Sequence, residues 1–472
     1  MSTDLVRIRT GVYHDSVSLM RVSQAITALP GVEVAVVAMA TELNLGIAAD
    51  LGFDLPGAGP SDLLIALRSG APAELEAAAA ELDRLLSGLA GRTAGGTAVE
   101  HPPRTVRAAA RDGAATLALV SVPGPHAFAE ALDAIEAGLS VMIFSDNVPV
   151  EQEVLLKKRA DELDVLVMGP DCGTAVIGGV GLGFANVLRP GPVGVVAASG
   201  TGAQQVTCLL DLAGVGVSHV LGVGGRDLSE EVGGRSTLRA LRALDADPAT
   251  ELIVLVSKPP AAEVAHAVRE AVAKLGTPVV TALLGPGQDD LTTATETALR
   301  ALGAKVPAWR SWPAPAPEQS RPGGGAAGAE ARAGRLRGVY SGGTLCVEAR
   351  LVAGTGEFTD FGDDAYTRGR AHPMIDPALR LEALAEVPPG DVALLDVILG
   401  HGADPDPSAR LAPGIAAAVA RGVPVVVALV GAEGDPQGLR AQAEALRAAG
   451  AAVFVSNAQA AGHAAALLAG AR

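Results

Sequence analysis

The sequence predicts a multidomain α/β protein, and three observations predict that class. The chain has 472 residues, which at roughly 100–200 residues per domain gives about three or four folded units. Hydrophobic residues make up 49% of the chain and aromatic residues only 3%, so its cores consist mainly of Ala, Val, Leu and Ile. Short aliphatic runs alternate with helical patterns, as in parallel sheets that helices cover.

Residues 1–100 are expected to form a small α+β domain. Aliphatic runs predict its strands, and apolar residues at helical spacing predict its helices. Asp15-Ser16 is a typical N-cap for the first helix, and a Gly-rich stretch closes the domain. The expected strands are Val6–Val12, Val32–Val37 and Leu63–Leu67, and the expected second helix is Ala71–Leu89.

Residues 101–190 predict a Rossmann-like domain, because strands and helices alternate along them as in a doubly wound parallel sheet. A Pro-Gly-Pro turn, Pro123 to Pro125, separates the first strand from the first helix. The expected strands are Thr116–Val122, Val141–Ser145 and Val165–Met168, and the expected helices are Phe128–Ala137 and Glu151–Leu163.

Residues 191–306 and 336–472 resemble each other, which predicts two copies of one α/β domain. In each copy a strand leads into a turn of Ser, Gly and Thr, and two further aliphatic runs follow at similar spacing. The matching pairs are Val193–Ala197 with Gly338–Tyr340, Leu252–Val256 with Val392–Asp396, and Gly276–Val280 with Gly422–Val426. Residues 307–335, rich in Pro and Gly, have the composition of a linker.

Charge and cysteine content limit the partners and the compartment. The net charge is −16, and no basic block is present, so neither nucleic acid nor an anionic membrane is expected as a partner. The three cysteines lie far apart, which indicates neither a disulfide framework nor a Cys-rich metal site. No export signal or membrane span is evident, and a reducing cytoplasm is expected. A small anionic substrate or a protein partner remains.

The Ser/Gly/Thr turns of the two copies are the first candidate sites. Each follows a strand and precedes a helix, so free backbone N–H groups and the helix dipole favour an anion there. The alternative is that these residues only make the turn and cap the helix. The candidate ligand-binding residues are Ser199, Gly200, Thr201 and Gly202 in the first copy, and Ser341, Gly342, Gly343 and Thr344 in the second.

Further candidates follow other predicted strands. Gly224 and Gly225 form a flexible turn before Arg226, whose guanidinium suits phosphate or carboxylate, although a salt bridge to Asp227 or Glu230 is an equal alternative. Two polar residues stand where strands of the Rossmann-like unit end, and we expect them in the same crevice. These residues are Asn147 and Asp171.

A polar, turn-rich segment of the fourth unit supplies the catalytic candidates Arg370, His372 and Asp376. Cations, an imidazole and a carboxylate in so short a segment suit the binding of an oxyanion or a carboxylate. The alternative is a solvated loop. The spacing of His, Cys, Asp and Glu predicts no metal site, and no Walker A pattern occurs.

The sequence resembles the α subunit of succinyl-CoA synthetase and, more closely, the FdrA family. The first resemblance is carried by Gly169-Pro170-Asp171-Cys172, by Val193-Gly194-Val195-Val196 with Ser199-Gly200-Thr201, and by Gly222-Val223-Gly224-Gly225 before Asp247-Pro248. The second is carried by Asp15 to Met20, Phe144 to Val148, Gly224 to Ser229, Val256 to Pro260 and His372 to Pro377. These resemblances imply a CoA-binding-type domain at 101–190 and flavodoxin-type, succinyl-CoA-synthetase-like domains at 191–306 and 336–472.

The resemblance also implies a function. The ligases carry phosphate on a histidine in a Gly-His-Ala-Gly motif after the strand Val279–Leu283, whereas Gly285-Pro286-Gly287-Gln288 stands there in this chain. FdrA-family proteins resemble a subunit of oxamate carbamoyltransferase, which interconverts oxamate plus carbamoyl phosphate with oxalurate plus phosphate in allantoin catabolism. We therefore expect a carbamoyltransferase subunit that acts with partner subunits. Phosphate is assigned to Ser199–Gly202 and Gly224–Arg226, and oxamate to Arg370 and His372.

Two alternatives stay open. One is an NDP-forming acyl-CoA synthetase that lacks the phosphohistidine, and only under this interpretation are CoA or a nucleotide expected as cofactors. The other is a non-catalytic scaffold that retains ligase domains to organise a complex. Turnover of carbamoyl phosphate distinguishes the first hypothesis from both.

Overall fold

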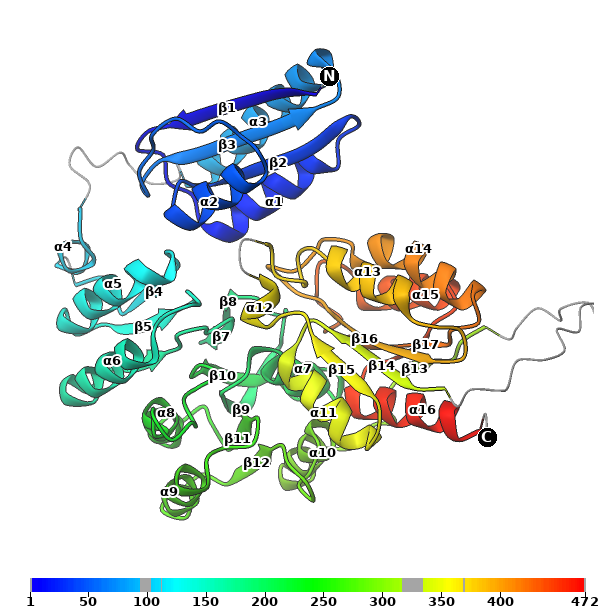
Figure 1. Cartoon of the computed structure of the whole chain (residues 1–472). Helices are drawn as coiled ribbons and strands as arrows, with labels where there is room; N and C mark the ends of the chain where they lie inside the picture. The colour runs from blue at the N-terminus through cyan, green and yellow to red at the C-terminus, as the bar shows by residue number, and fades with distance from the viewer. Residues whose placement is uncertain (1, 94–102, 112, 316–333, 368–369, 471–472) are drawn as a thin grey trace, which may run out of the picture.

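The computed structural model contains four β-sheets along the chain (Figure 1). It describes residues 2–93, 103–111, 113–315, 334–367 and 370–470. Two three-stranded sheets come first in the sequence, and two six-stranded sheets follow. The mixed α/β class with a small N-terminal domain, predicted from the aliphatic runs, is confirmed.

The N-terminal sheet is antiparallel, with its third strand in the centre. Leu19, Val22 and Ile26 of α1 and Leu82 of α3 pack on one face, while α2 covers the other with Ala48 and Phe53 beyond its end. The strands are β1 (Thr3–Arg9), β2 (Val32–Met39) and β3 (Leu63–Ser69), and the helices are α1 (Ser16–Thr27), α2 (Glu42–Asp50) and α3 (Pro72–Thr93). Asp15 caps α1 by accepting the Ser18 N–H, as its place before the helix predicts.

The second sheet is parallel, in the order β4-β5-β6. Its helices α5 and α6 pack against each other over a small aliphatic core. The strands are β4 (Leu117–Val120), β5 (Ser140–Ile143) and β6 (Val167–Met168), and the helices are α4 (Val106–Ala110), α5 (Gly124–Glu136) and α6 (Val150–Leu163). All three strands point their carboxyl ends to one edge, as parallel strands must.

The third sheet has the order β12-β11-β9-β10-β7-β8. Strands β12, β11, β9 and β10 are parallel, and the β7–β8 hairpin forms the other end of the sheet, where β7 pairs antiparallel with β10. The sheet therefore starts before residue 190, where the sequence suggested a boundary. The strands are β7 (Thr174–Ile177), β8 (Val180–Gly183), β9 (Pro190–Ala197), β10 (Val217–Gly222), β11 (Leu252–Ser257) and β12 (Val279–Leu283).

The fourth sheet has the order β13-β18-β17-β16-β14-β15. Strand β13 lies within the segment expected as a linker, and it pairs antiparallel with β18, so the start of that segment is part of the sheet. Residues 316–333 of the expected linker lie outside the described residues. The strands are β13 (Ser311–Trp312), β14 (Leu336–Tyr340), β15 (Glu357–Asp360), β16 (Val392–Ile398), β17 (Val425–Val430) and β18 (Ala452–Phe454).

The two large sheets repeat one topology. The run of parallel strands β10-β9-β11-β12 corresponds strand for strand to β15-β14-β16-β17. This order is the flavodoxin-type 2-1-3-4 arrangement. The helices of the first copy are α7 (Gly200–Leu212), α8 (Arg235–Asp245), α9 (Ala262–Val272) and α10 (Leu291–Ala301). Those of the second are α11 (Gly343–Ala353), α12 (Asp364–Thr367), α13 (Ala378–Glu386), α14 (Pro407–Ala420), α15 (Leu439–Ala448) and α16 (Asn457–Gly470).

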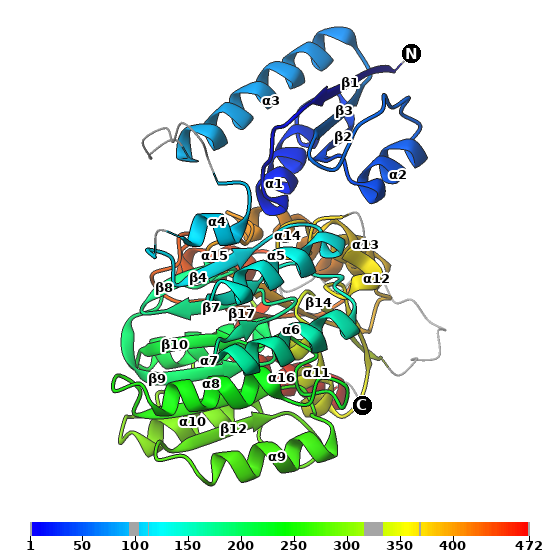
Figure 2. The same ribbon diagram turned by 90° about the vertical axis from the view of Figure 1, so that its left-hand side faces the viewer.

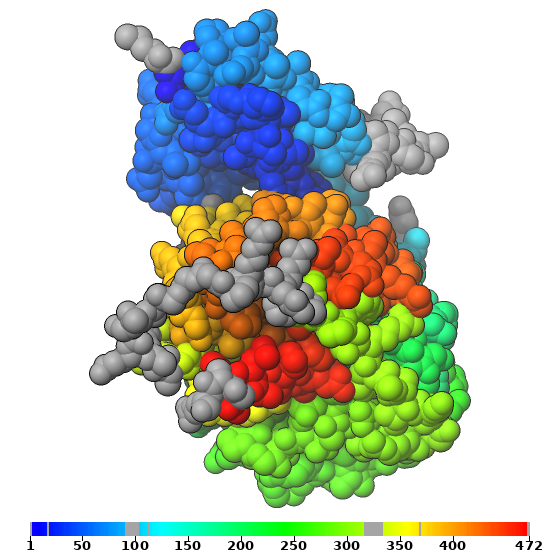
Figure 3. Space-filling view, turned by 90° about the vertical axis from the view of Figure 1, so that its right-hand side faces the viewer, coloured from blue at the N-terminus to red at the C-terminus, as the bar shows by residue number. Residues whose placement is uncertain are grey.

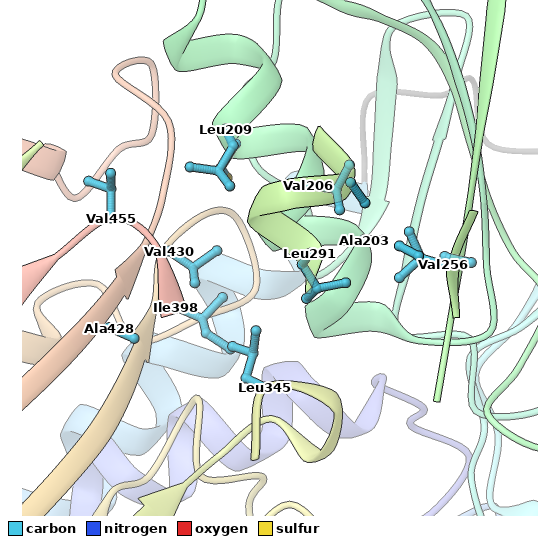
Figure 4. Close-up of a cluster of buried hydrophobic side chains, with 14 of the residues drawn as sticks. Ala203, Val206, Leu209, Val256, Leu291, Leu345, Ile398, Ala428, Val430 and Val455 are labelled. Atoms are coloured by element: carbon cyan, nitrogen blue, oxygen red, sulfur yellow. The ribbon is translucent and has the colours of Figure 1, made fainter. Parts of the chain in front are cut away.

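One hydrophobic core joins the two copies. Val206 and Leu209 of α7 belong to the same buried cluster as Leu345 of α11 and Ile398 and Val430 of the fourth sheet (Figure 4). Helices α7 and α11 are in contact, and α16 packs on both α11 and α10. The two units therefore share their interior, and their relative position is fixed by side-chain packing rather than by the connecting segment.

Polar contacts across this interface follow a pseudo-twofold pattern. Gln205, six residues after the N-cap Ser199, accepts the backbone N–H of Asn457 at the start of α16 at 3.0 Å. Glu348, six residues after the N-cap Gly342, accepts the N–H of Leu291 at the start of α10 at 2.6 Å. Helix α7 of the first copy thus caps α16, the last helix of the second copy, and α11 of the second copy caps α10, the last helix of the first.

The Glu348 carboxylate is the charged member of this pair. It is fully buried, and burial raises its pKa to about 7, although the Asn457 amide donates to it at 2.7 Å. The unfolded chain therefore releases this proton at a lower pH than the folded chain does. Glu348 accordingly contributes stability at low pH that is lost as the pH rises from its ordinary value of 4.5 through about 7.

Replacing Glu348 by Gln removes this titration and flattens the dependence of stability on pH. The free energy of unfolding of the parent relative to that of Glu348→Gln should fall by about 3 kcal/mol between pH 4 and pH 8. Denaturant unfolding of both proteins at several pH values measures this slope. Glu444→Gln, at an exposed position of α15, is the matched control and should leave it unchanged. If the pH dependence of stability in Glu348→Gln equals that of the parent, Glu348 is not the titrating group.

Candidate functional site

The N-terminal ends of α7 and α11 meet at the centre of the molecule (Figures 1 and 2). A methyl group added to Gly342 would lie within 2.7–2.9 Å of the Thr201 side chain, and one added to Gly202 would lie 3.1 Å from Thr344 Cγ2. Glycine is required at both positions because the helix ends approach so closely. The two Ser/Gly/Thr turns of the sequence are thus brought together.

The first turn combines a capped helix with a switch point. Ser199 Oγ accepts the Gly202 N–H at 2.9 Å, so the capping alternative holds for that group. The N–H groups of Gly200 and Thr201 lie in the first turn of α7, where no preceding helical carbonyl is available to them. The turn lies between β9 and β11, where the strand order reverses and where ligands bind in such sheets.

The second turn already holds a carboxylate. Asp396, fully buried on β16, accepts the N–H groups of Ser341 and Gly342 at 2.7 and 2.8 Å and the Ser341 hydroxyl at 3.0 Å. Arg380 forms an ion pair with Asp396 at 3.0 Å. These two N–H groups are therefore not available to an external anion. The N–H groups of the second turn that remain are those of Gly343 and Thr344, in the first turn of α11.

Lys258 is a cation beside these helix ends, and the sequence reasoning did not select it. A methyl group added to Gly343 would lie 2.9 Å from Lys258 Nζ and would collide with the Asp360 carboxylate. Lys258 is exposed, follows β11 directly, and has no ion-pair partner in the described part of the chain. The signal that could have identified it is a lysine placed directly after a buried aliphatic strand at the switch point.

The Gly224–Arg226 turn packs on the loop that follows β6. Gly224 has φ +91°, and a methyl group on it would lie 2.6 Å from the Pro170 carbonyl oxygen. The alternative raised by the sequence, a salt bridge from Arg226 to Asp227 or Glu230, is not formed. Its Nε donates to the buried Glu153 at 3.0 Å and its Nη2 to the Val148 carbonyl at 2.7 Å.

A buried ion cluster holds Arg226 in this position. Glu153 also pairs with Lys157 at 2.7 Å, and Lys157 pairs with Asp227 at 2.8 Å. Asp227 in turn accepts the Thr237 N–H and hydroxyl at the start of α8. Because the Glu153, Lys157 and Asp227 side chains are at most 1% exposed, the cluster fixes the turn, while Arg226 keeps 47% of its side chain exposed.

Asp171 and Asn147 lie at neighbouring strand ends, as the sequence predicted from their positions after strands. Both have left-handed backbone conformations, with φ +56° and +53°, and the Asp171 N–H donates to the Ser145 carbonyl at 2.9 Å. The Asp171 carboxylate reaches solvent, yet protein surrounds it closely. This desolvation, together with Asp146 and Asp364, raises its pKa to about 7, while Lys258 and Arg226 oppose the rise.

His372 lies on the other side of the same helix ends. A methyl group on Gly362 would lie 2.9 Å from His372 Nε2, 3.1 Å from Asp360 Oδ1 and 2.5 Å from the Ser341 carbonyl oxygen. Its Nδ1 accepts the Met374 N–H at 3.2 Å, which places the proton of the neutral ring on Nε2. Burial lowers the pKa of His372 to about 4, so the imidazole is a neutral N–H donor at pH 7.

The other two catalytic candidates are differently placed. Asp376 forms an ion pair with Arg410 at 2.8 Å and accepts the Ala378 N–H at the start of α13, so its contacts are structural. Arg370 has an exposed side chain, and its backbone N–H donates to the Thr367 carbonyl at 3.1 Å. The structure therefore brings His372, but neither of its two predicted companions, against the helix ends.

Comparison with known proteins identifies the domains. Residues 1–102 match a family described as "AllF, heavy metal-associated domain", residues 189–283 match a CoA-binding domain, and residues 339–467 match a CoA-ligase domain. The CoA-binding match thus covers the first flavodoxin-type copy, whereas the resemblance implied a CoA-binding-type domain at 101–190. The uncharacterized protein YahF of Escherichia coli K12 is 36% identical over 504 aligned positions, which span 95% of each chain.

The chain belongs to the FdrA family. The FdrA-family chain is also 31% identical to the succinate–CoA ligase subunit alpha 2 of Archaeoglobus fulgidus, over 35% of this chain and 58% of that protein. The ATP citrate lyase structure from Methanothrix soehngenii aligns at 21% identity and a TM-score of 0.33, over 43% of this chain and 38% of that one. The chain thus covers only part of each of these two proteins. These domains place it in an enzyme-related family.

The metal that the first matched family's description implies does not fit this FdrA-family chain. Residues 1–102 contain no cysteine, and the thiolate is the ligand that soft metals prefer. Across the described ranges, the structure holds no group of three or more His, Cys, Asp or Glu side chains placed to bind a metal ion. Within the same ranges, no helix is both long and apolar enough to cross a membrane.

The assembled groups suit a doubly charged oxyanion. Two helix ends, Lys258 and Arg226 supply positive potential, and Asp171 supplies a negative charge that appears only near neutral pH. An anion bound near these groups is therefore held more weakly as the pH rises through about 7, because the ionised Asp171 carboxylate repels it.

Sulfate, which carries the same charge throughout this range, tests that behaviour. Its dissociation constant should rise roughly fivefold between pH 6 and pH 8 for the parent, because the ionised carboxylate repels the dianion. Asp171→Asn should bind equally well at both pH values in a calorimetric titration. Asp164→Asn, at the other described aspartate of left-handed backbone, is the matched control and should behave like the parent. Parent-like pH dependence in Asp171→Asn would show that another group titrates.

Proposed function

We propose that this FdrA-family chain is a carbamoyltransferase subunit that transfers the carbamoyl group of carbamoyl phosphate to oxamate. The observation that carries the proposal is the meeting of the α7 and α11 N-terminal ends beside Lys258. Helix N-termini and a lysine are the groups that bind phosphate in many proteins. The matched AllF-type domain supports the same assignment.

The reaction needs no phosphoenzyme, which agrees with the residues after β12. The oxamate nitrogen attacks the carbamoyl carbon, the bond from that carbon to the phosphate oxygen breaks, and the proton lost by the nitrogen ends on the departing phosphate. Gly200, Thr201 and Lys258 hold the phosphate and stabilise its growing charge. In this proposal the exposed part of Arg226, which its bonds to Glu153 and Val148 hold in place, binds the same anion.

Two further groups have protonation states that suit the transfer. The neutral His372 donates its Nε2 proton to the carbamoyl oxygen, or to the acceptor's carboxylate, as the tetrahedral centre forms. Asp171, whose pKa of about 7 matches the working pH, accepts the nitrogen's proton and passes it to the phosphate. Arg370 completes the acceptor end in this proposal, together with partner subunits.

A CoA-dependent ligase is the second candidate function, because residues 189–283 match a CoA-binding domain. Under that function CoA would bind to this domain, whereas CoA enters no step of the proposed carbamoyl transfer. The same titrations that test carbamoyl phosphate separate the two functions.

Calorimetry of the full chain, alone and with co-expressed partners, against carbamoyl phosphate and then CoA tests the proposal. Binding of carbamoyl phosphate without a CoA response, followed by oxamate-dependent formation of oxalurate, is the expected result. Binding of CoA alone would return the chain to the acyl-CoA ligases, and binding of neither in the complete complex would favour a scaffold.

Replacing Lys258 by Gln should weaken the binding of carbamoyl phosphate about tenfold or more, because a charge-assisted hydrogen bond is lost. Arg226→Ala should likewise raise the concentration of carbamoyl phosphate required for half-maximal rate. Lys274→Gln, at an exposed lysine beyond α9, is the matched control and should bind as the parent does. Equal affinity in Lys258→Gln and Lys274→Gln would remove Lys258 from the site.

A further inference from the structure

The N-terminal domain sits on the fourth unit of the chain (Figures 2 and 3). Helix α1 makes the contact through two side chains one turn apart. Arg21 Nη2 donates to the Ala403 carbonyl at 3.1 Å, and Gln24 Nε2 donates to the Ile375 carbonyl at 3.0 Å. Both acceptors are backbone oxygens, so α1 recognises the course of two turns rather than their side chains.

The first of these turns carries His372. The N–H groups of Ile375 and Asp376 donate to the His372 carbonyl at 2.7 and 3.0 Å, and the Met374 N–H donates to its ring. Gln24 therefore donates to the carbonyl of the Ile375–Asp376 peptide, and the N–H of the same peptide donates to the His372 carbonyl. Arg410 Nη1 shares the Ile375 carbonyl at 3.1 Å.

The second turn closes the other side of the imidazole. Ala403 follows Gly402, on which a methyl group would lie 2.7 Å from the Phe184 ring. That ring packs against the imidazole of His372 with the centroids 5.9 Å apart. Gln24 thus holds the turn that carries His372, and Arg21 holds the turn that contacts the Phe184 ring on which the imidazole packs.

The same domain also reaches the second sheet. Tyr13, in the loop between β1 and α1, donates its hydroxyl proton to the Ser121 carbonyl at 2.8 Å, directly after β4. The domain thereby bridges the carboxyl edge of the second sheet and the His372 turn. Since its residues do not fit a metal, this bridge is the function that its contacts support.

We propose that Arg21 and Gln24 of the N-terminal domain are positioning residues, which hold the His372 turn in place so that the imidazole stays packed on Phe184 and beside the N-terminal end of α11. The proposal rests on the proposed function only for its kinetic consequence. The groups that face the imidazole are the Phe184 ring, the Ser341 carbonyl and Asp360 beside Gly362, with Arg380 further away. Loss of the two hydrogen bonds from Arg21 and Gln24 admits water to the imidazole.

Nuclear magnetic resonance of histidine-labelled full-length protein tests the positioning directly. The signal of His372 is identified by its absence from His372→Gln. In the parent this ring should protonate only near pH 4, because burial disfavours the charged form. In Arg21→Ala/Gln24→Ala it should protonate at least one pH unit higher, towards the ordinary 6.5, while the other histidines keep their titration curves.

Two controls separate positioning from general destabilisation. Arg84→Ala, which removes an exposed ion pair on α3, should leave the His372 titration as in the parent. Arg21→Lys with Gln24 retained should restore it, because the donor to the Ala403 carbonyl returns. A His372 titration unchanged in the double alanine variant would overturn the proposal.

The kinetic readout distinguishes this proposal from the proposed function. If oxalurate forms, the double variant should raise the KM for oxamate while the KM for carbamoyl phosphate stays near that of the parent, because the phosphate site lies at Lys258. If no carbamoyl transfer is found but the titration shifts, the positioning stands and the proposed reaction fails.

Discussion

The contact between the N-terminal ends of α7 and α11 is the constraint on which the rest of the structure depends. Two helix ends carry partial positive charge and repel each other, so such a contact needs compensation. Gly202 and Gly342 permit the approach, and acidic groups offset the charge: Asp396 binds the second turn, and Asp360 lies against Gly343. A bound dianion would complete this compensation.

The duplicated fold explains why the helix ends meet. A flavodoxin-type sheet presents the turns after its first and third strands at one edge, and two copies packed through a shared core bring those edges together. The copies then differ where chemistry is needed. The first offers Lys258 at the end of β11, whereas the second places Asp396 within β16, so one side attracts an anion and the other fills its own turn.

Much of the fold was predictable because its strands are buried aliphatic runs; β9, β11, β14 and β16 all lie where the sequence indicated. Strands β10 and β15 lack this signal, since His219 interrupts one and polar residues fill the other. The two turns at the helix ends were predicted from their Ser, Gly and Thr residues. Arg226 could not be paired correctly, because its partner Glu153 lies 73 positions away on another domain.

The two turns are asymmetric, because the second binds a carboxylate of the protein itself. The Asp396 carboxylate accepts the N–H groups of Ser341 and Gly342, as a phosphate would accept those of Gly200 and Thr201. Arg380 forms an ion pair with this buried carboxylate. Removing either partner would leave a buried charge without compensation, which proteins tolerate poorly. The second copy therefore complements the first: it places a helix end, Asp360 and the His372 turn beside Lys258 or its neighbours, and Arg21 and Gln24 of the N-terminal domain donate to the two turns at Ala403 and Ile375.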